Sequence, residues 1–291
     1  MAKDLLLRIA EIGVGLHCDI MENKIHLQGA IQKFLVQDGE PEISIRVCWD
    51  ELRQKARGRK VFDSGTTWKL YDCDGSYLIR LTAPLFGPVP YKEALFNPDF
   101  SRGEIRLHRP FFSPEVPLDP LEYPLDELLI SNYLARGKGV EVHACGMVDS
   151  QGRGYLFLGP SGAGKSTMAK LWQGQPGVRV LSDDRIIIRQ EGGDFWIHGT
   201  PWHGDAGSSF PGRALLKSAY FLERGVRNET IPLRKAEASG RLFAFSFPPF
   251  YSKEGIEFIL DFLGKMVEHI PFYELRFLPD QEVVHFLQKL A

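Results

Sequence analysis

Hydrophobic and polar residues alternate along the first third of the chain, which predicts short β-strands. Residues 42–50, 67–84 and 103–112 carry this pattern most clearly. The middle segment holds Asp74-Gly75 between two alternating runs, and such a dipeptide readily adopts the positive φ angles of a tight hairpin. We therefore expect a small, sheet-rich N-terminal domain.

Residues 113–124 separate this region from the rest of the chain. Their sequence, SPEVPLDPLEYP, contains four prolines. Proline fits neither a helix interior nor a central strand, so no regular element is expected to continue through it. We place the domain boundary here, with an N-terminal domain of residues 1–118, suited to recognising a substrate or partner, and a second domain of residues 119–291.

The second region mixes helical and strand patterns. Residues 125–133 have leucines at helical spacing, residues 140–149 alternate as a strand with two different faces, and residues 154–158 (GYLFL) are apolar throughout, which is typical of a strand buried on both faces. Further strands are expected at residues 178–185, 214–225 and 272–277, and helices at 255–270 and 281–290. Their order predicts an α/β fold, of the mixed-sheet α+β kind.

The segment GPSGAGKST, residues 159–167, matches the phosphate-binding pattern G-x-x-x-x-G-K-[ST], the P-loop or Walker A motif. It follows an apolar strand and precedes a helix-compatible segment, as the motif requires. Glycines let backbone N–H groups turn toward a phosphate, and the helix N-terminus adds a favourable dipole. The nucleotide-binding residues predicted here are Gly159, Ser161, Gly162, Ala163, Gly164, Lys165, Ser166 and Thr167.

The chemistry of these residue types suggests a role for each. Lys165 is expected to neutralise the β- and γ-phosphates, and the Ser166 hydroxyl to bind Mg²⁺. The strand at 178–185 ends in Asp183-Asp184, where a crossover would place both acids beside the loop. One aspartate would hold the metal, with Asp183 our assignment, and the other would orient or deprotonate a hydroxyl. The sequence leaves the two roles interchangeable.

Two further groups complete the candidate catalytic set. If Asp149 pairs with Gly154 in the hairpin, His143 falls opposite Pro160 at the mouth of the phosphate loop. The glycine-rich segment 198–213 could close over a substrate, and Arg213 would then stabilise charge on the transferred group. His198 and His203, in the same segment, lack a third ligand and are interpreted as polar lining or surface.

Taken together, these residues resemble a known group. The run from residue 125 to 167, the LSDD strand end and HGTPWHG at 198–204 are similar to HPr-kinase-related proteins of the phosphoenolpyruvate-carboxykinase-like P-loop superfamily. The resemblance extends from about residue 120 to the C-terminus. It implies a P-loop catalytic domain that uses ATP and Mg²⁺, with His143, Asp183 and Asp184 in the catalytic set, and it allows a homo-oligomer.

The sequence also departs from that group. Thr167 stands where HPr kinases carry an acid, and the segment by which they recognise their carrier protein is not visible after residue 185. Neither HPr as the substrate nor the reverse phosphorylase reaction is therefore expected. The substrate motifs of the carboxykinases are also missing.

Composition narrows the list of partners. The chain has 35 Lys and Arg against 37 Asp and Glu, a net charge of -2, which gives no basic surface for nucleic acid. Its four cysteines are scattered, as expected for reduced thiols in a cytoplasmic protein. The apolar run near the N-terminus contains charged residues, and no stretch is long enough to span a membrane, so neither a signal peptide nor membrane insertion is expected.

Two functional hypotheses remain. The first is a Mg²⁺-dependent kinase that transfers the γ-phosphate of ATP to a hydroxyl, either a serine of a peptide or protein or a small alcohol. The alternative is a nucleotide-gated binding module, for example an accessory protein in peptide modification, with only slow NTP hydrolysis. The sequence does not choose between ATP and GTP.

Overall fold

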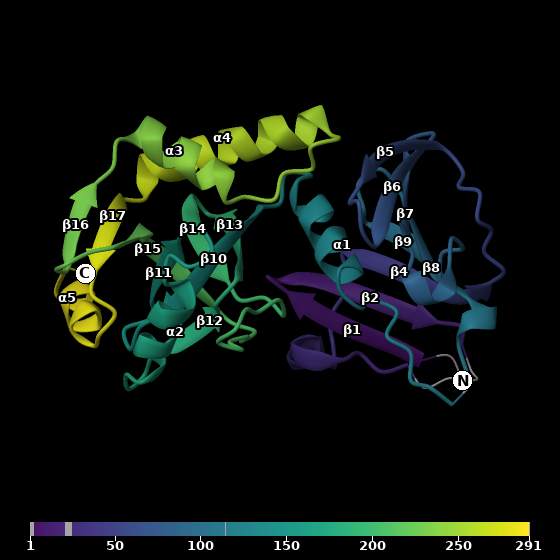
Figure 1. Ribbon diagram of the computed structural model, residues 1–291, viewed down its shortest axis with the longest axis horizontal. Coiled ribbons are helices and arrows are strands. Elements are labelled where there is room, and N and C mark those ends of the chain that lie inside the picture. The colour runs from purple at the N-terminus through teal and green to yellow at the C-terminus, as the bar shows by residue number, and fades with distance from the viewer. Residues whose placement is uncertain (1–2, 21–24, 114, 291) are drawn as a thin grey trace. The chain divides into compact units, whose positions relative to one another are not determined.

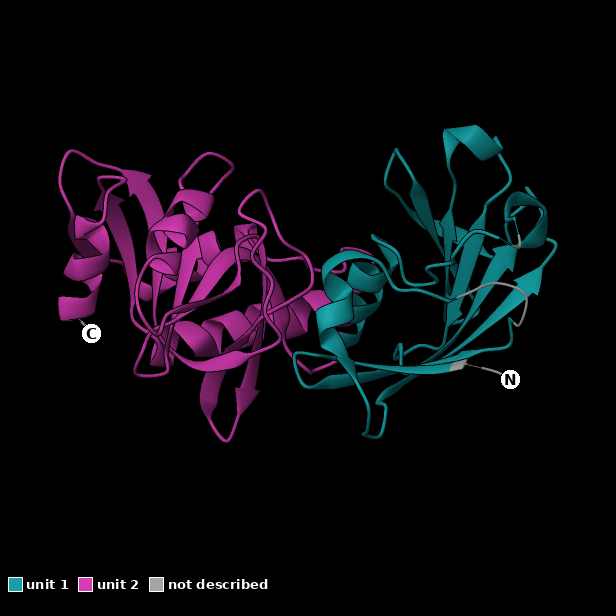
Figure 2. Ribbon diagram, turned by 90° about the horizontal axis from the view of Figure 1, so that it is seen from below, with its two compact units in different colours: residues 1–133 teal, residues 134–291 magenta. Residues whose placement is uncertain are grey.

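The computed structural model describes residues 3–20, 25–113 and 115–290 (Figure 1). The chain divides into two compact units, residues 1–133 and 134–291 (Figure 2). Each unit contains a mixed β-sheet, in agreement with the expected combination of helices with mixed sheets. The functional boundary expected after residue 118 stays a prediction.

Unit 1, over its described residues, is built on a nine-stranded sheet with the order β3-β1-β2-β4-β9-β8-β7-β6-β5. Strand β4 runs parallel to both β2 and β9, and the remaining neighbours are antiparallel. The strands are β1 (Lys3–Ile9), β2 (Ile12–Cys18), β3 (Leu35–Val36), β4 (Ile43–Asp50), β5 (Arg59–Asp63), β6 (Trp68–Cys73), β7 (Ser76–Leu81), β8 (Lys92–Phe96) and β9 (Arg102–His108), and the unit ends in helix α1 (Leu125–Leu134).

The hairpin predicted at Asp74-Gly75 is confirmed. Strands β6 and β7 pair from Cys73 opposite Ser76, with φ angles of 56° at Asp74 and 89° at Gly75. Two positive φ angles in a two-residue loop match the right-handed twist of the strands that it joins. Local sequence alone therefore determined this turn.

The proline-rich segment at residues 113–124 is attached to unit 1. The side chains of Leu118 and Leu121 are buried, and the Asp119 carbonyl accepts a hydrogen bond of 2.9 Å from Nζ of Lys92. The Asp119 carboxylate accepts another, of 2.8 Å, from the amide of Gln28. Apolar residues between the prolines thus dock this segment onto the unit.

Unit 2 contains an eight-stranded sheet in its described residues, with the order β11-β10-β13-β14-β15-β17-β16 and β12 beside β10. Strand β11 also pairs with β15, so β11, β10, β13, β14 and β15 close into a ring. The strands are β10 (Val140–Val148), β11 (Arg153–Leu158), β12 (Arg179–Ser182), β13 (Arg185–Glu191), β14 (Asp194–His198), β15 (Arg213–Arg224), β16 (Glu229–Pro232) and β17 (Phe272–Phe277), and the helices are α2 (Lys165–Gln173), α3 (Lys235–Ala244), α4 (Lys253–His269) and α5 (Glu282–Leu290).

Helices cover both sides of this sheet (Figure 1). Apolar residues of α3 and α4 share one buried cluster with Leu156 and Leu158 of β11, whereas residues of α2 and α5 share a second cluster with Tyr155 and Phe157 of the same strand. The prediction that residues 154–158 form a strand buried on both faces is confirmed. This packing fixes the strand from which the phosphate loop leaves.

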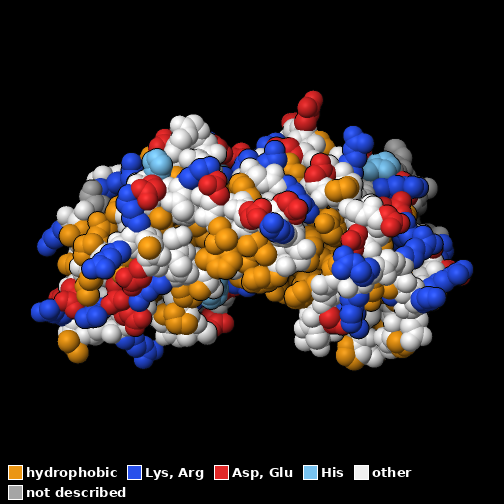
Figure 3. Space-filling view, turned by 90° about the horizontal axis from the view of Figure 1, so that it is seen from above, with side chains coloured by type: hydrophobic (Ala, Val, Ile, Leu, Met, Phe, Trp, Pro, Cys, Tyr) orange, Lys and Arg blue, Asp and Glu red, His pale blue; other side chains and the backbone are white. Residues whose placement is uncertain are grey.

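Acidic and basic side chains are interspersed on the face seen in Figure 3, in keeping with the net charge of -2. Within the described ranges, no helix combines the length and apolar character needed to cross a lipid bilayer.

Candidate active site

The predicted phosphate loop, residues 159–164, connects the end of β11 to the start of α2. Gly162 and Gly164 have φ angles of 83° and 109°, which side chains rarely tolerate. A Cβ atom on Gly164 would also lie 2.7 Å from Cζ of Phe277. Glycine is therefore required directly before α2, where the first amide groups of the helix have no partner within the helix and the helix dipole favours an anion.

Lys165, the first residue of α2, is turned back toward the loop. Its Nζ donates hydrogen bonds of 2.7 Å to the Gly159 carbonyl and 3.2 Å to that of Pro160, and the residue is buried. Burial lowers the pKa of Lys165, while the negative charge of Asp184 acts in the opposite direction. A buried ammonium group held beside a glycine-rich loop is suited to binding phosphate.

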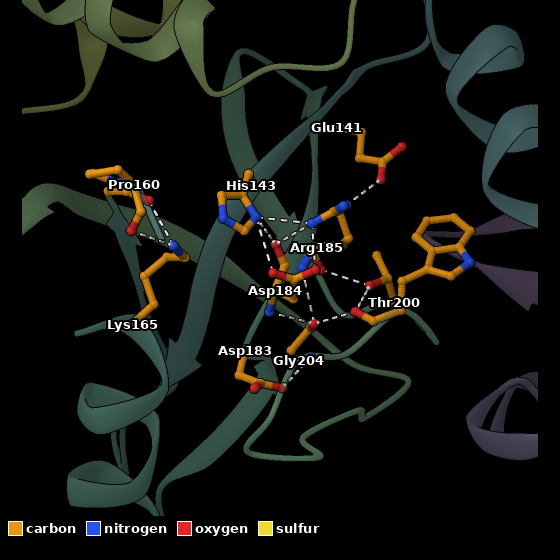
Figure 4. Close-up of polar contacts among 12 residues, drawn as sticks. Glu141, His143, Pro160, Lys165, Asp183, Asp184, Arg185, Thr200 and Gly204 are labelled. Atoms are coloured by element: carbon orange, nitrogen blue, oxygen red, sulfur yellow. Dashed lines mark hydrogen bonds and ion pairs between the residues drawn. The ribbon is translucent and has the colours of Figure 1, made fainter. Parts of the chain in front are cut away.

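Asp184 contacts two basic side chains, those of His143 and Arg185 (Figure 4). Its Oδ1 is 3.1 Å from Nδ1 of His143, and its Oδ2 accepts a hydrogen bond from the guanidinium of Arg185. Nη1 of Arg185 is also 2.9 Å from Nδ1 of His143, so the three side chains form one cluster. The guanidinium stacks over the ring of Phe247, 4.5 Å from its centroid, which fixes its plane.

The cluster keeps the Asp184 carboxylate ionised. Burial alone would raise the pKa of this group, but the hydrogen bond from His143 and the positive charges of Arg185 and Lys165 outweigh it and lower the pKa. An ionised carboxylate next to a phosphate loop can orient a hydroxyl and take up its proton.

The position of His143 differs by one residue from the expected register. Val148, not Asp149, pairs with Gly154, and Ala144 pairs with Leu158, so His143 faces the level of Gly159 rather than Pro160. The reason is the turn, in which the Asp149 carboxylate accepts hydrogen bonds from the amides of Gln151 and Arg153 and draws Arg153 into the strand. His143 therefore lies at the level of the first residue of the predicted phosphate loop.

Arg185 was missed by the sequence reasoning. It is the cross-strand partner of His143 in the β10–β13 ladder, although the two are 42 residues apart in the chain. Side chains that pair directly across antiparallel strands lie on the same face, which brings the guanidinium to the imidazole. The one available signal was that Arg185 directly follows the two aspartates.

Asp183 occupies a different environment from its neighbour. It is 1% exposed, and its carboxylate accepts hydrogen bonds from the amides of Gly204 at 3.2 Å, Ala206 at 2.8 Å and Ser208 at 3.1 Å. It points to the loop after β14 and away from His143 and Arg185 (Figure 4). The two adjacent acids are therefore not equivalent.

The loop at residues 199–212 is fixed to the strands beside it. Thr200 Oγ1 donates to the Arg185 carbonyl at 2.7 Å, and the Trp202 carbonyl accepts from Ser182 Oγ at 2.8 Å. On the side of α2, Nε2 of Gln173 donates to Ser208 Oγ at 2.6 Å. Hydrogen bonds thus tie this loop to β12, β13 and α2, and its closure over a substrate stays a prediction.

Arg213 is not brought to this cluster. It begins β15 and forms an ion pair with Glu191 at 2.7 Å. Phe221, eight residues further along β15, is the residue that pairs with Leu158 beside the phosphate loop. At roughly 3.3 Å per residue, Arg213 lies roughly 26 Å down the strand from that position. Its expected role in stabilising charge has no support in this placement.

The described residues of the site offer few ligands for the predicted magnesium ion. Among the described residues, no group of three or more His, Cys, Asp or Glu side chains could hold a metal. Ser166, half-buried in the first turn of α2, supplies a hydroxyl oxygen, whereas the carboxylate of Asp183, the other predicted metal ligand, accepts three backbone N–H groups. Mg²⁺ keeps several waters and takes phosphate oxygens, so such a partial set suits a cation that arrives with the nucleotide.

His203 is exposed, whereas His198 is buried at the end of β14. Burial, helped by the positive charges of Arg189 and Arg213, lowers the pKa of His198 to about 3. His198 is thus neutral in the folded protein over the pH range in which it becomes protonated in the unfolded chain.

Acid should therefore destabilise the protein through His198. The free energy of unfolding is expected to be highest above pH 6.5 and to fall, by up to ~1.4 kcal/mol per pH unit from this residue, as the pH drops toward 3. In His198→Leu this slope should become shallower, as measured by urea unfolding at pH 7 and pH 4.5. His203→Leu is the exposed control, and equal slopes in both variants would contradict the assignment.

The chain was compared with family models, curated proteins and solved structures. No family model matches the chain, and the search of curated proteins found no match. Among solved structures, the chain is similar to the HPr(Ser) kinase/phosphatase from Coxiella burnetii, with 12% identity and a TM-score of 0.29, over 52% of this chain and 99% of that chain. This is a weak structural kinship, and the phosphoenolpyruvate-carboxykinase-like fold stays a prediction.

Proposed function

We propose that the protein is a Mg²⁺-dependent kinase that transfers the γ-phosphate of ATP to a hydroxyl group. One observation carries the proposal: the ionised Asp184 carboxylate, held by His143 and Arg185, lies within electrostatic reach of the phosphate-loop ammonium of Lys165. Phosphoryl transfer depends mainly on positioning and charge stabilisation, so a set of this size is sufficient.

Each group has a definite task in this reaction. Bound Mg·ATP supplies the phosphoryl group and a divalent charge. Lys165 and the amides at the start of α2 bind the phosphates. Asp184 orients the acceptor hydroxyl and takes its proton as the new O–P bond forms and the bond to the ADP oxygen breaks. Arg185 and His143 hold the Asp184 carboxylate in place and keep it ionised.

The acceptor is proposed to be a serine of a peptide or protein, or a small alcohol. A carboxylate base next to a phosphate loop is suited to a neutral hydroxyl, which must lose its proton during transfer. Water is the default acceptor of any such site, so slow ATP hydrolysis should accompany the activity.

The test follows the γ-phosphate. The full chain, incubated with γ-labelled ATP and Mg²⁺, should transfer label to serine-containing peptides or small alcohols, and should release labelled phosphate slowly without an acceptor. Calorimetry should detect Mg·ATP binding in the same preparation. Well-folded protein that binds no Mg-nucleotide would refute the proposal.

Arg185 can be tested against Arg213, an arginine away from the site, as its control. Arg185→Gln removes the cation that holds Asp184 and is expected to lower ATP turnover about 10²-fold, the scale of a lost charge-stabilising contact. Arg213→Gln alters an ion pair at the far end of β15 and should change turnover by no more than about twofold. Steady-state hydrolysis assays compare the two, and an equal loss in both would contradict the placement of Arg185 in the site.

A further inference from the structure

The Asp183 carboxylate is bound by backbone amides of the protein itself. Three amides from alternate positions of one loop converge on its carboxylate, two on Oδ1 and one on Oδ2, and only 1% of the residue is exposed. By contrast, 27% of the Asp184 side chain is exposed. N–H groups of the chain thus occupy both carboxylate oxygens of Asp183.

The loop that carries these amides is shaped around Asp183. A Cβ atom on Gly204 would lie 3.0 Å from Oδ2 of Asp183 and 3.4 Å from Cβ of Asp184, so glycine allows the backbone to come this close. The other end of the loop is held from the phosphate-loop helix, where Gln173 donates to Ser208. Asp183 and α2 thus fix the two ends of residues 204–208.

We propose that Asp183 is a positioning residue that anchors the loop at residues 204–208, and that Asp184 is the acid of this pair that acts at the reacting centre. The first half concerns the fold of the chain alone, and the second half rests on the proposed kinase function. The assignment separates two neighbouring aspartates that the sequence left interchangeable. A Cβ atom on Gly204 would lie 3.4 Å from Cβ of Asp184, so the anchored loop runs beside the acid that is proposed to act at the reacting centre.

Amide hydrogen exchange on the full chain tests the anchor directly, without any nucleotide. In Asp183→Asn, one carboxylate oxygen becomes an NH₂ group that cannot accept a hydrogen bond. The amides that face the new NH₂ group, either Ala206 alone or Gly204 and Ser208 together, are expected to exchange at least about tenfold faster, the scale of a lost hydrogen bond to a charged group. The matched control is Asp184→Asn, which should leave exchange at these three amides unchanged.

Magnesium dependence of ATP hydrolysis supplies the second readout. Asp183→Asn should lower kcat, while the KM for Mg·ATP and the magnesium concentration for half-maximal rate stay within about twofold of the wild type. Asp183→Glu, which keeps the carboxylate, should restore most of the protection of the loop amides against hydrogen exchange. Suppose instead that Asp183→Asn raises the magnesium concentration needed for half-maximal rate and leaves hydrogen exchange at residues 204–208 unchanged. Asp183 is then a metal ligand, and the assignment is wrong.

Further measurements distinguish the proposal that Asp183 anchors the loop from the proposal that the protein is a kinase. Should Asp183→Asn fail to fold, Gln173→Ala loosens the loop from the other end and should speed exchange at Ser208 without changing the magnesium dependence. Faster exchange throughout unit 2 in both variants would mean general destabilisation and would overturn the anchor. Fast exchange confined to residues 204–208 in a protein that binds no nucleotide would support the anchor and refute the kinase.

Discussion

Lys165→Ala is expected to abolish measurable phosphate transfer, lowering ATP turnover about 10²- to 10³-fold. That range is typical for removal of one group that stabilises charge in a transition state. The ammonium is buried against the Gly159 and Pro160 carbonyls, where water cannot replace it. Affinity for Mg·ATP should fall as well, because the same charge contacts the phosphates in the ground state. Label transfer and calorimetry measure the two effects.

The neighbouring helix offers a control for this variant. Lys170 lies on α2 too, but it is exposed, so Lys170→Ala should keep turnover within about twofold of the wild type. Melting temperatures of the two variants would reveal any loss of folding. Wild-type turnover in Lys165→Ala would mean that the phosphate loop does not bind the nucleotide that reacts.

Asp184→Asn is expected to separate binding from chemistry. The amide keeps the shape of the side chain but cannot take a proton, so turnover should fall about 10²- to 10⁴-fold, the usual contribution of a general base. Affinity for Mg·ATP should be retained, because the phosphate loop is unchanged and one negative charge near the phosphates is lost. Calorimetry and single-turnover assays with γ-labelled ATP give the two quantities.

Asp194→Asn serves as the control for loss of one negative charge. Asp194 is exposed at the start of β14 and pairs with Glu191 in the turn of the β13–β14 hairpin, away from the phosphate loop. Its variant should retain full turnover. Retained turnover in Asp184→Asn, or a nucleotide affinity that falls in step with turnover, would contradict a role for Asp184 in the chemical step.

Local sequence was enough to predict several elements of this fold. The Asp74-Gly75 hairpin, the apolar strand β11 and the α4 helix each depend on residues that are close in the chain, and each is found where it was expected. Strands β13 and β14 were not predicted, and no element was assigned to residues 186–197. Pairing with distant strands, not local propensity, determines that they form.

The predicted phosphate loop could be located from the sequence by itself, because its nine residues are consecutive and their glycines, lysine and hydroxyls have meaning without any long-range contact. It also indicated that two acids follow a strand nearby. The tertiary structure alone decided how they differ: the β10–β13 ladder pairs His143 with Arg185 around Asp184, and the loop after β14 encloses Asp183.

Tertiary structure also decided the position of Arg213. The sequence placed this residue near the phosphates, but it lies at the end of β15 opposite to the part that pairs with Leu158 beside the phosphate loop. Spacing along the chain does not reveal which end of a strand lies beside a given loop. That depends on strand order and register, which are set by packing among residues far apart in the sequence.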